Sequence, residues 1–236
     1  MHLKRVRIFP DKFPTQAHYP FSLDVMQQTE ELVFSTPVTF FVGENGTGKS
    51  TLLRAICQRC GIHIWQNREG ARVKRNPFEN LLFTALGIEW ADGSVPGSYF
   101  GSDIFEQFAR IVEEWASTDP AQLQYFGGRS LLSQSHGQSL MAYFTSRYQI
   151  EGLYFLDEPE TALSPRTQIQ LLQLLRAMSE AGHAQFLVAT HSPLLLACPG
   201  ATIYSFDSTS VSPIPYHDTM HYQVYKQFME NPGSFV

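Results

Sequence analysis

Eight consecutive residues, Gly43–Ser50, read Gly-Glu-Asn-Gly-Thr-Gly-Lys-Ser and fit the pattern G-x-x-x-x-G-K-S. Glycines adopt backbone angles that are closed to other residues, so such a loop can wrap a phosphate group with its N–H groups. The pattern predicts that Lys49 reaches the β- and γ-phosphates of a nucleotide and that the Ser50 hydroxyl coordinates Mg²⁺. An apolar run at 38–42 precedes the loop and a helical pattern follows it, which is the context that the motif requires.

The loop and the start of the following helix supply the residues that we expect to contact the phosphates. They are Gly43, Glu44, Asn45, Gly46, Thr47, Gly48, Lys49, Ser50 and Thr51.

Two acidic residues, Asp157 and Glu158, follow the apolar run 152–156. A continuous apolar run is typical of a parallel strand buried on both faces, and ligands of such sheets bind at the carboxyl ends of the strands. We expect Asp157 to hold Mg²⁺ through a water molecule and Glu158 to polarise an attacking water. The simpler alternative is an acidic loop that only ends a strand.

A second apolar run, 186–189, leads through Thr190 to His191. A histidine at the end of such a strand can donate a hydrogen bond to a γ-phosphate or to the attacking water. The alternative is a histidine that only caps the strand. The predicted catalytic residues are therefore Lys49, Glu158 and His191.

A further anion-binding helix start is predicted at Ser135, His136, Gly137 and Gln138, just before the apolar helical stretch 140–144. Ser135 stands where a helix N-cap is expected, and Gly137 lets a phosphate approach the backbone closely. The chain thus has one phosphate loop but two helix starts that could bind an anion, one near Lys49 and one near Ser135. We therefore expect the second device to serve the nucleotide of another protomer.

The chain has 236 residues, 43% of them hydrophobic, and a net charge of −5. This size suits one large α/β domain or a domain with an inserted lobe. The overall charge does not favour a polyanion partner, so any nucleic-acid footprint must be local. The polar segment 61–76, with Arg68, Arg72, Lys74 and Arg75, is a candidate basic patch, although a solvated loop is the simpler interpretation.

Compartment is predicted from the cysteines and from the lack of long apolar stretches. Three cysteines do not form a disulfide framework, which favours a reducing compartment. Charged residues near Met1 replace the apolar run of a signal peptide, and no stretch reaches the roughly 18 residues of a spanning helix. We expect a cytoplasmic protein with no membrane insertion of its own.

The four motifs occur in a fixed order, and Asp157 follows Ser135 by 22 residues while His191 follows Asp157 by 34. In this order and spacing, residues 3–206 resemble the ABC-type ATPases. More narrowly, the chain is similar to the small stand-alone bacterial ATPases grouped with structural-maintenance-of-chromosomes and overcoming-lysogenisation-defect type proteins. Two positions depart from the family pattern: His136 replaces the first glycine of the signature, and Ser164 stands where an aspartate is often found.

The resemblance implies an ATP hydrolase that uses Mg²⁺ and forms an ATP-sandwich dimer. Each ATP would lie between residues 43–51 of one chain and 135–138 of the other. The implied work is in DNA transactions or defence, with DNA, RNA or a protein as effector. Two other functions stay open: the ATP-binding subunit of a membrane transporter, and a nucleotide-gated binding module with little hydrolysis.

The expected fold class is α/β, with a mainly parallel core sheet, helices on both faces, an N-terminal antiparallel β part and a helical signature lobe. We expect one domain over 1–236, with the lobe inserted at about 77–150. Turn residues within 87–100 predict a β-hairpin, and apolar spacing predicts a helix that ends at Trp115. A closing helix is expected over 217–228.

Overall fold

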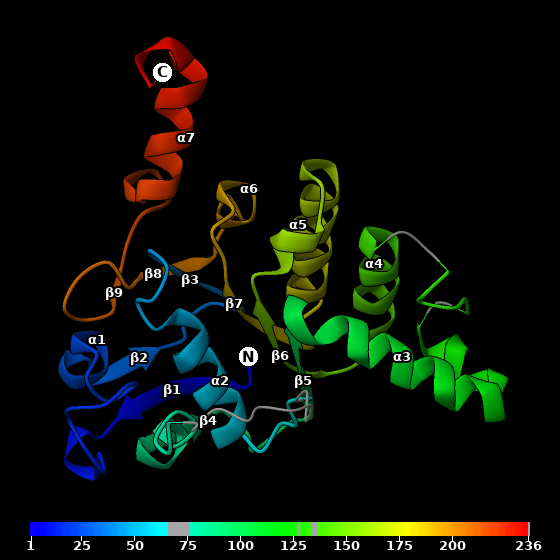
Figure 1. Cartoon of the computed structure of the whole chain (residues 1–236), viewed down its shortest axis with the longest axis horizontal. Coiled ribbons are helices and arrows are strands. Elements are labelled where there is room, and N and C mark those ends of the chain that lie inside the picture. The colour runs from blue at the N-terminus through cyan, green and yellow to red at the C-terminus, as the bar shows by residue number, and fades with distance from the viewer. Residues whose placement is uncertain (66–75, 127, 134–135, 236) are drawn as a thin grey trace.

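The computed structural model describes residues 1–65, 76–126, 128–133 and 136–235. Within these residues, the larger of two sheets has six strands in the order β5-β6-β7-β3-β8-β9 (Figure 1). All neighbouring strands in it run parallel except the last pair, β8 and β9. Along the chain, these strands are β3 (Val38–Val42), β5 (Gly97–Gly101), β6 (Gly152–Asp157), β7 (Ala184–Ala189), β8 (Thr202–Ser205) and β9 (Ser212–Pro213).

A smaller sheet contains the N-terminal strand. Strand β1 (Leu3–Ile8) pairs antiparallel with β2 (Glu31–Val33) on one side and with β4 (Leu86–Trp90) on the other. Leu3 and Val6 are fully buried, whereas Lys4 and Arg7 are exposed. The expected antiparallel β part at the N-terminus is confirmed.

Helices cover both faces of the larger sheet (Figure 1). Along the described chain, the helices are α1 (Asp24–Gln28), α2 (Lys49–Arg59), α3 (Ser102–Thr118), α4 (His136–Arg147), α5 (Pro165–Glu180), α6 (Pro193–Leu196) and α7 (Met220–Glu230), and α2 packs on one face of the sheet while α3, α4 and α5 pack on the other. Successive residues of β3 point to opposite faces. Phe41 packs in the core with α2 and the smaller sheet, whereas Phe40 and Val42 pack in the core with α3, α4 and α5. The predicted α/β class, with a mainly parallel sheet between helical layers, is confirmed.

The predicted hairpin within 87–100 is wrong. Strand β4 pairs with β1 in the smaller sheet, whereas β5 pairs parallel with β6 in the larger one. Gly97, which suggested a turn, instead permits a close strand contact, because a Cβ there would lie 2.0 Å from the carbonyl oxygen of Leu153. The glycine is therefore required by the close packing of β5 against β6. Between β4 and β5 the chain crosses from the smaller sheet to the larger one.

Two predicted helices are present. The helix expected to end at Trp115 is α3, which continues to Thr118, and the closing helix is α7. In Figure 1, α7 projects away from the rest of the molecule, and none of its residues is buried. Among the described residues, no helix combines the length and the apolar character needed to cross a membrane.

A buried amide joins the two sheets. Gln185 of β7 is fully buried, and its Oε1 accepts hydrogen bonds from the backbone N–H groups of His2 and Leu3, both at 2.8 Å. Its Nε2 donates to the Leu3 carbonyl at 3.0 Å. Because β1 begins at Leu3, one side chain of the parallel sheet sets where the smaller sheet starts.

We expect Gln185→Leu to destabilise the fold by roughly 2–5 kcal/mol, because it leaves buried backbone groups without partners. Urea unfolding measures the change. Gln173→Leu, at an exposed position of α5, is the matched control and should shift stability by less than about 0.5 kcal/mol. Equal stability of the two variants would contradict the role of the buried amide.

Candidate functional site

The loop between β3 and α2 closes around the side chain of Lys49. Lys49 is only 4% exposed, and its Nζ donates to the carbonyl oxygens of Gly43 at 2.7 Å and Glu44 at 2.8 Å. Gly46 and Gly48 adopt φ angles of +83° and +102°, which a side chain would disfavour. The carbonyl oxygens at the beginning of the loop therefore hold the lysine ammonium inside it.

An aspartate from beyond β8 holds the beginning of this loop. The backbone N–H of Glu44 donates to Asp207 Oδ1 at 2.8 Å. A Cβ on Gly43 would lie 3.0 Å from the same oxygen, so the loop and the aspartate are in close contact. Within the loop, the Thr47 hydroxyl donates to the Glu44 carbonyl at 2.9 Å. Asp207 was not singled out in the sequence, because no local motif surrounds it.

Asp157, at the end of β6, is contacted by three side chains from two other elements, α2 and β5. The Ser50 hydroxyl of α2 donates to its Oδ1, and the Tyr99 hydroxyl of β5 donates to its Oδ2, both at 2.6 Å. Arg54 of α2 places its Nε 3.6 Å from Oδ2. A hydroxyl and a carboxylate oxygen thus converge beside the phosphate loop. Hard oxygen ligands of this kind suit Mg²⁺, so the residues fit the expected ion.

Glu158 and His191 face each other across the edge of the sheet. His191 Nε2 lies 3.7 Å from Glu158 Oε1. Glu158 has a φ of +47°, a left-handed conformation that is uncommon for a residue with a side chain. Its N–H donates to the Ala189 carbonyl at 2.9 Å, which continues the β6–β7 pairing through the turn. Such strained residues often occur at functional sites.

The backbone of His191 is held by another carboxylate. Its N–H donates to Glu160 Oε1 at 2.5 Å. Burial raises the pKa of Glu160, and the hydrogen bond from His191 opposes that rise. The ring of His191 contacts a second histidine: His191 Nδ1 lies 2.9 Å from His221 Nε2 of α7.

The ionisable groups of the site are shifted by burial. Burial lowers the pKa of Lys49, and the neighbouring carboxylates, Glu158 first, oppose that change. Burial is also the largest cause of the lowered pKa of His191, followed by the positive charge of Lys49. Burial lowers the pKa of His221 in the same direction. Both histidines are therefore neutral at neutral pH.

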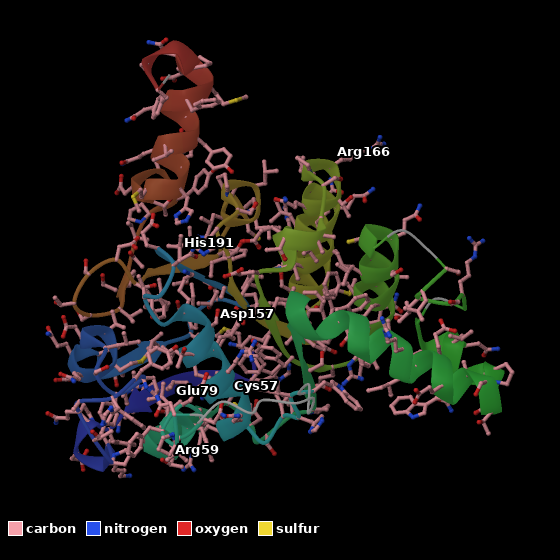
Figure 2. All side chains as sticks on the ribbon, in the orientation of Figure 1. Cys57, Arg59, Glu79, Asp157, Arg166 and His191 are labelled. Atoms are coloured by element: carbon pink, nitrogen blue, oxygen red, sulfur yellow. The ribbon has the colours of Figure 1, made fainter. Side chains whose placement is uncertain are left out.

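A cavity of about 360 Å³ lies beside Ser50, Asp157 and Glu158. Its wall includes Tyr19 and Thr51, whose hydroxyls are hydrogen bonded to each other. Figure 2 shows Asp157 at the centre of the molecule and His191 between it and the base of α7. Both carboxylates therefore line this cavity, whereas His191, 3.7 Å from Glu158, lines a second cavity of about 530 Å³.

The structure brings together most of the predicted site residues. Lys49, Ser50, Asp157, Glu158 and His191 meet at the carboxyl edge of the parallel sheet. Asn45 is exposed on the loop surface.

The predicted second anion device lies elsewhere. Gly137 and Gln138 lie at the beginning of α4, where a Cβ on Gly137 would be 3.7 Å from the Ala162 carbonyl. Ser135 falls outside the described residues, and of His136 only its place at the first position of α4 is described. The candidate basic segment from Arg68 to Arg75 also falls outside them.

Two regions of the chain match known protein families. Residues 127–197 match the family described as "AAA domain, putative AbiEii toxin, Type IV TA system". Residues 18–73, which include the phosphate loop, match a family described as "AAA domain". Both matched regions are AAA-type domains, and the predicted resemblance to AAA/ABC-type P-loop ATPases is confirmed.

The curated relatives of the chain are named as ATP-binding proteins of transport systems. The "Probable siderophore transport system ATP-binding protein YusV" of Bacillus subtilis (strain 168) is 28% identical over 186 residues, which cover 72% of this chain and 67% of that protein. The chain thus spans about two thirds of the length of the curated relatives it matches.

Solved structures of chromosome-maintenance head domains share the fold. The SMC head domain from Thermotoga maritima superposes with a TM-score of 0.50 at 17% identity, over 91% of this chain and 99% of that one. The SmcHead bound to the C-winged helix domain of ScpA gives a TM-score of 0.56 at 11% identity, over 91% and 97% of the two chains. At these identities the likeness concerns the fold.

Acid should destabilise this P-loop ATPase partly through its two paired histidines. Their pKa values are lowered in the folded chain, so the unfolded chain takes up protons first and stability falls as pH drops below about 6.5. A variant with both His191→Asn and His221→Asn should lose less stability between pH 7.5 and 5.5. Urea unfolding across this range tests the expectation, and parallel pH curves for variant and wild type would contradict it.

Proposed function

We propose that the chain is a cytoplasmic ATPase that binds ATP with Mg²⁺ and hydrolyses it in an ATP-sandwich dimer. The observation that carries this proposal is the meeting of four elements at one sheet edge. Ser50 contacts Asp157 at 2.6 Å across 107 residues of sequence, and Glu158 lies 3.7 Å from His191. No local motif requires these contacts, whereas phosphoryl transfer does.

Each side chain has a role that its surroundings support. Among the described residues, two carbonyl oxygens accept from Lys49 Nζ, which leaves the third N–H for a phosphate oxygen. Ser50 and Asp157 would hold Mg²⁺, which supplies positive charge against the phosphates. Glu158 orients the attacking water and accepts its proton, while His191 donates a hydrogen bond to the γ-phosphate.

The place of α4 supports the dimer. In Figure 1, α4 lies on the far side of α5 and β6 from α2, and no described residue of α4 lines the cavity at Ser50. Gly137 and Gln138 therefore cannot serve the chain's own phosphate loop in this arrangement. A second copy could bring its α4 to this loop, so that the segment 135–138 completes the site from outside.

The effector is proposed to be nucleic acid or protein, in DNA transactions or defence. The match to a family whose description names a toxin–antitoxin system favours defence. A second function, the ATP-binding subunit of a membrane transporter, is favoured by the relative named for siderophore transport. Stable capture of a polytopic membrane protein would select the transporter function over the stand-alone ATPase.

We expect Glu158→Gln to lower the steady-state ATPase rate at least 100-fold, because the amide cannot accept the proton of the water. Affinity for ATP should change less than about threefold, since Lys49 and the loop amides remain. Steady-state phosphate release and fluorescent-nucleotide titration measure the two quantities. Glu151→Gln, at an exposed position before β6, is the matched control and should hydrolyse ATP at the wild-type rate.

A wild-type rate of ATP hydrolysis in Glu158→Gln would remove Glu158 from the catalytic residues.

The same variant tests the dimer, because trapped ATP should hold two chains together. Size-exclusion chromatography with light scattering should show a dimer with Mg²⁺ and ATP, and a monomer with ADP. A monomer under both conditions would overturn the sandwich. Adding DNA or RNA to the wild-type assay then separates a nucleic-acid effector, which stimulates turnover, from a protein effector.

A further inference from the structure

The strand-end histidine is in contact with the C-terminal helix. His191 follows β7, whereas His221 is the second residue of α7, and His191 Nδ1 lies 2.9 Å from His221 Nε2. The ring centroids are 5.1 Å apart. This contact uses the ring nitrogen of His191 that points away from Glu158, so the imidazole bridges the ATP site and α7.

The beginning of α7 is firmly held at this place. Buried Thr219 caps the helix by accepting from the Tyr222 N–H at 3.3 Å, and its hydroxyl donates to the Tyr216 carbonyl at 2.8 Å. The Tyr216 hydroxyl donates to the Pro193 carbonyl at 3.0 Å, two residues beyond His191. The first turn of α7 is thus tied to the segment that carries the strand-end histidine.

A nitrogen–nitrogen hydrogen bond contains one proton, so one imidazole donates and the other accepts. If His221 donates from Nε2, then His191 carries its own proton on Nε2. If His191 donates from Nδ1, then its Nε2 is bare. The first assignment thus puts the second proton on His191 Nε2 and leaves His221 Nδ1 bare. The second assignment puts it on His221 Nδ1 and leaves His191 Nε2 bare.

The surroundings favour the first assignment. Both far nitrogens are buried and have no hydrogen-bond partner among the described residues. His191 Nε2 is 3.7 Å from the carboxylate of Glu158, which attracts an N–H and repels a lone pair. Each assignment leaves one buried N–H without a hydrogen-bond partner, on His191 in the first and on His221 in the second. Only the first places that N–H beside the Glu158 carboxylate.

We propose that His221 is a positioning residue that donates its Nε2–H to His191 and so keeps the proton of His191 on Nε2, facing the γ-phosphate position. The proposal rests on the ATPase function above. It gives α7 a part in the site, because His221 of this helix sets the tautomer of His191, which follows β7. In the absence of this donor, His191 would exchange between two tautomers, only one of which can donate to phosphate.

The test compares four proteins. His221→Leu removes the donor, His221→Gln keeps an amide N–H at similar reach, and His217→Leu is the matched control. His217 is exposed one turn before His221, and its ring contacts Tyr216 and Tyr222 rather than His191. Wild-type protein is the fourth, and thermal melts check that each variant folds.

Two readouts decide the proposal. Nitrogen-15 NMR of labelled histidines, with the His191 signal assigned through His191→Asn, should show His191 protonated on Nε2 in wild type and a tautomer mixture in His221→Leu. The kcat for ATP should fall in His221→Leu in proportion to the lost Nε2-protonated fraction, about twofold for an equal mixture, with KM unchanged. It should recover in His221→Gln and stay at the wild-type value in His217→Leu.

Protonation of wild-type His191 on Nδ1 would overturn the proposal. So would a wild-type tautomer in His221→Leu, or equal kcat losses in His221→Leu and His221→Gln. If the wild-type chain hydrolysed no ATP, the proposed function would fail, while the NMR readout would still decide which nitrogen His221 protects.

Discussion

The parallel pairing of β6, β7 and β3 is the constraint on which the site depends. In the observed register, Asp157 lies opposite Ala189, and Ala189 lies opposite Phe41. The three strands therefore end at one level, and the segments that follow them leave the sheet side by side. A shift of one residue in either pair would turn the side chains of that strand to the other face. The register thus brings a loop, two carboxylates and an imidazole together, although they belong to segments far apart in the sequence.

The residues at strand ends could be predicted because two local signals coincide there. An apolar run of strand length indicates a buried parallel strand, and the polar residue after it must lie at the carboxyl edge. This reasoning placed Asp157, Glu158 and His191 at one edge, and the phosphate-loop pattern after another apolar run placed Lys49 there. It needed no knowledge of strand order, since every parallel strand of a sheet ends on the same side.

Partners that depend on strand order or on packing could not be predicted. Tyr99 was missed because the turn residues before it suggested a hairpin, and turn residues do not reveal which strand a segment will join. Gly97 shows the ambiguity, since close approach to Leu153 and a tight turn both call for glycine. His221 was missed because α7 reaches His191 only through the capped segment at Thr219, and no periodicity links two histidines 30 residues apart.

Charge is unevenly distributed around the phosphate loop. Four carboxylates act on the buried ammonium of Lys49, and they belong to Glu158, Asp207, Asp157 and Glu44. Arg54 contributes a second positive group near Asp157. A polyphosphate entering such a site adds negative charge to an excess of negative charge. A cation bound to the polyphosphate would offset both, which is a physical reason for the proposed Mg²⁺ to arrive with the nucleotide.

The left-handed backbone of Glu158 also limits what mutation can do to this chain. Glycine, asparagine and aspartate tolerate a positive φ better than other residues do, and β-branched residues tolerate it least. In the genetic code, glycine and aspartate are each one base away from glutamate. A single transition or transversion could therefore remove the carboxylate or withdraw it by one methylene while the turn keeps its shape. Such a variant would keep the turn after β6 but would lose or displace the carboxylate that the proposed hydrolysis needs.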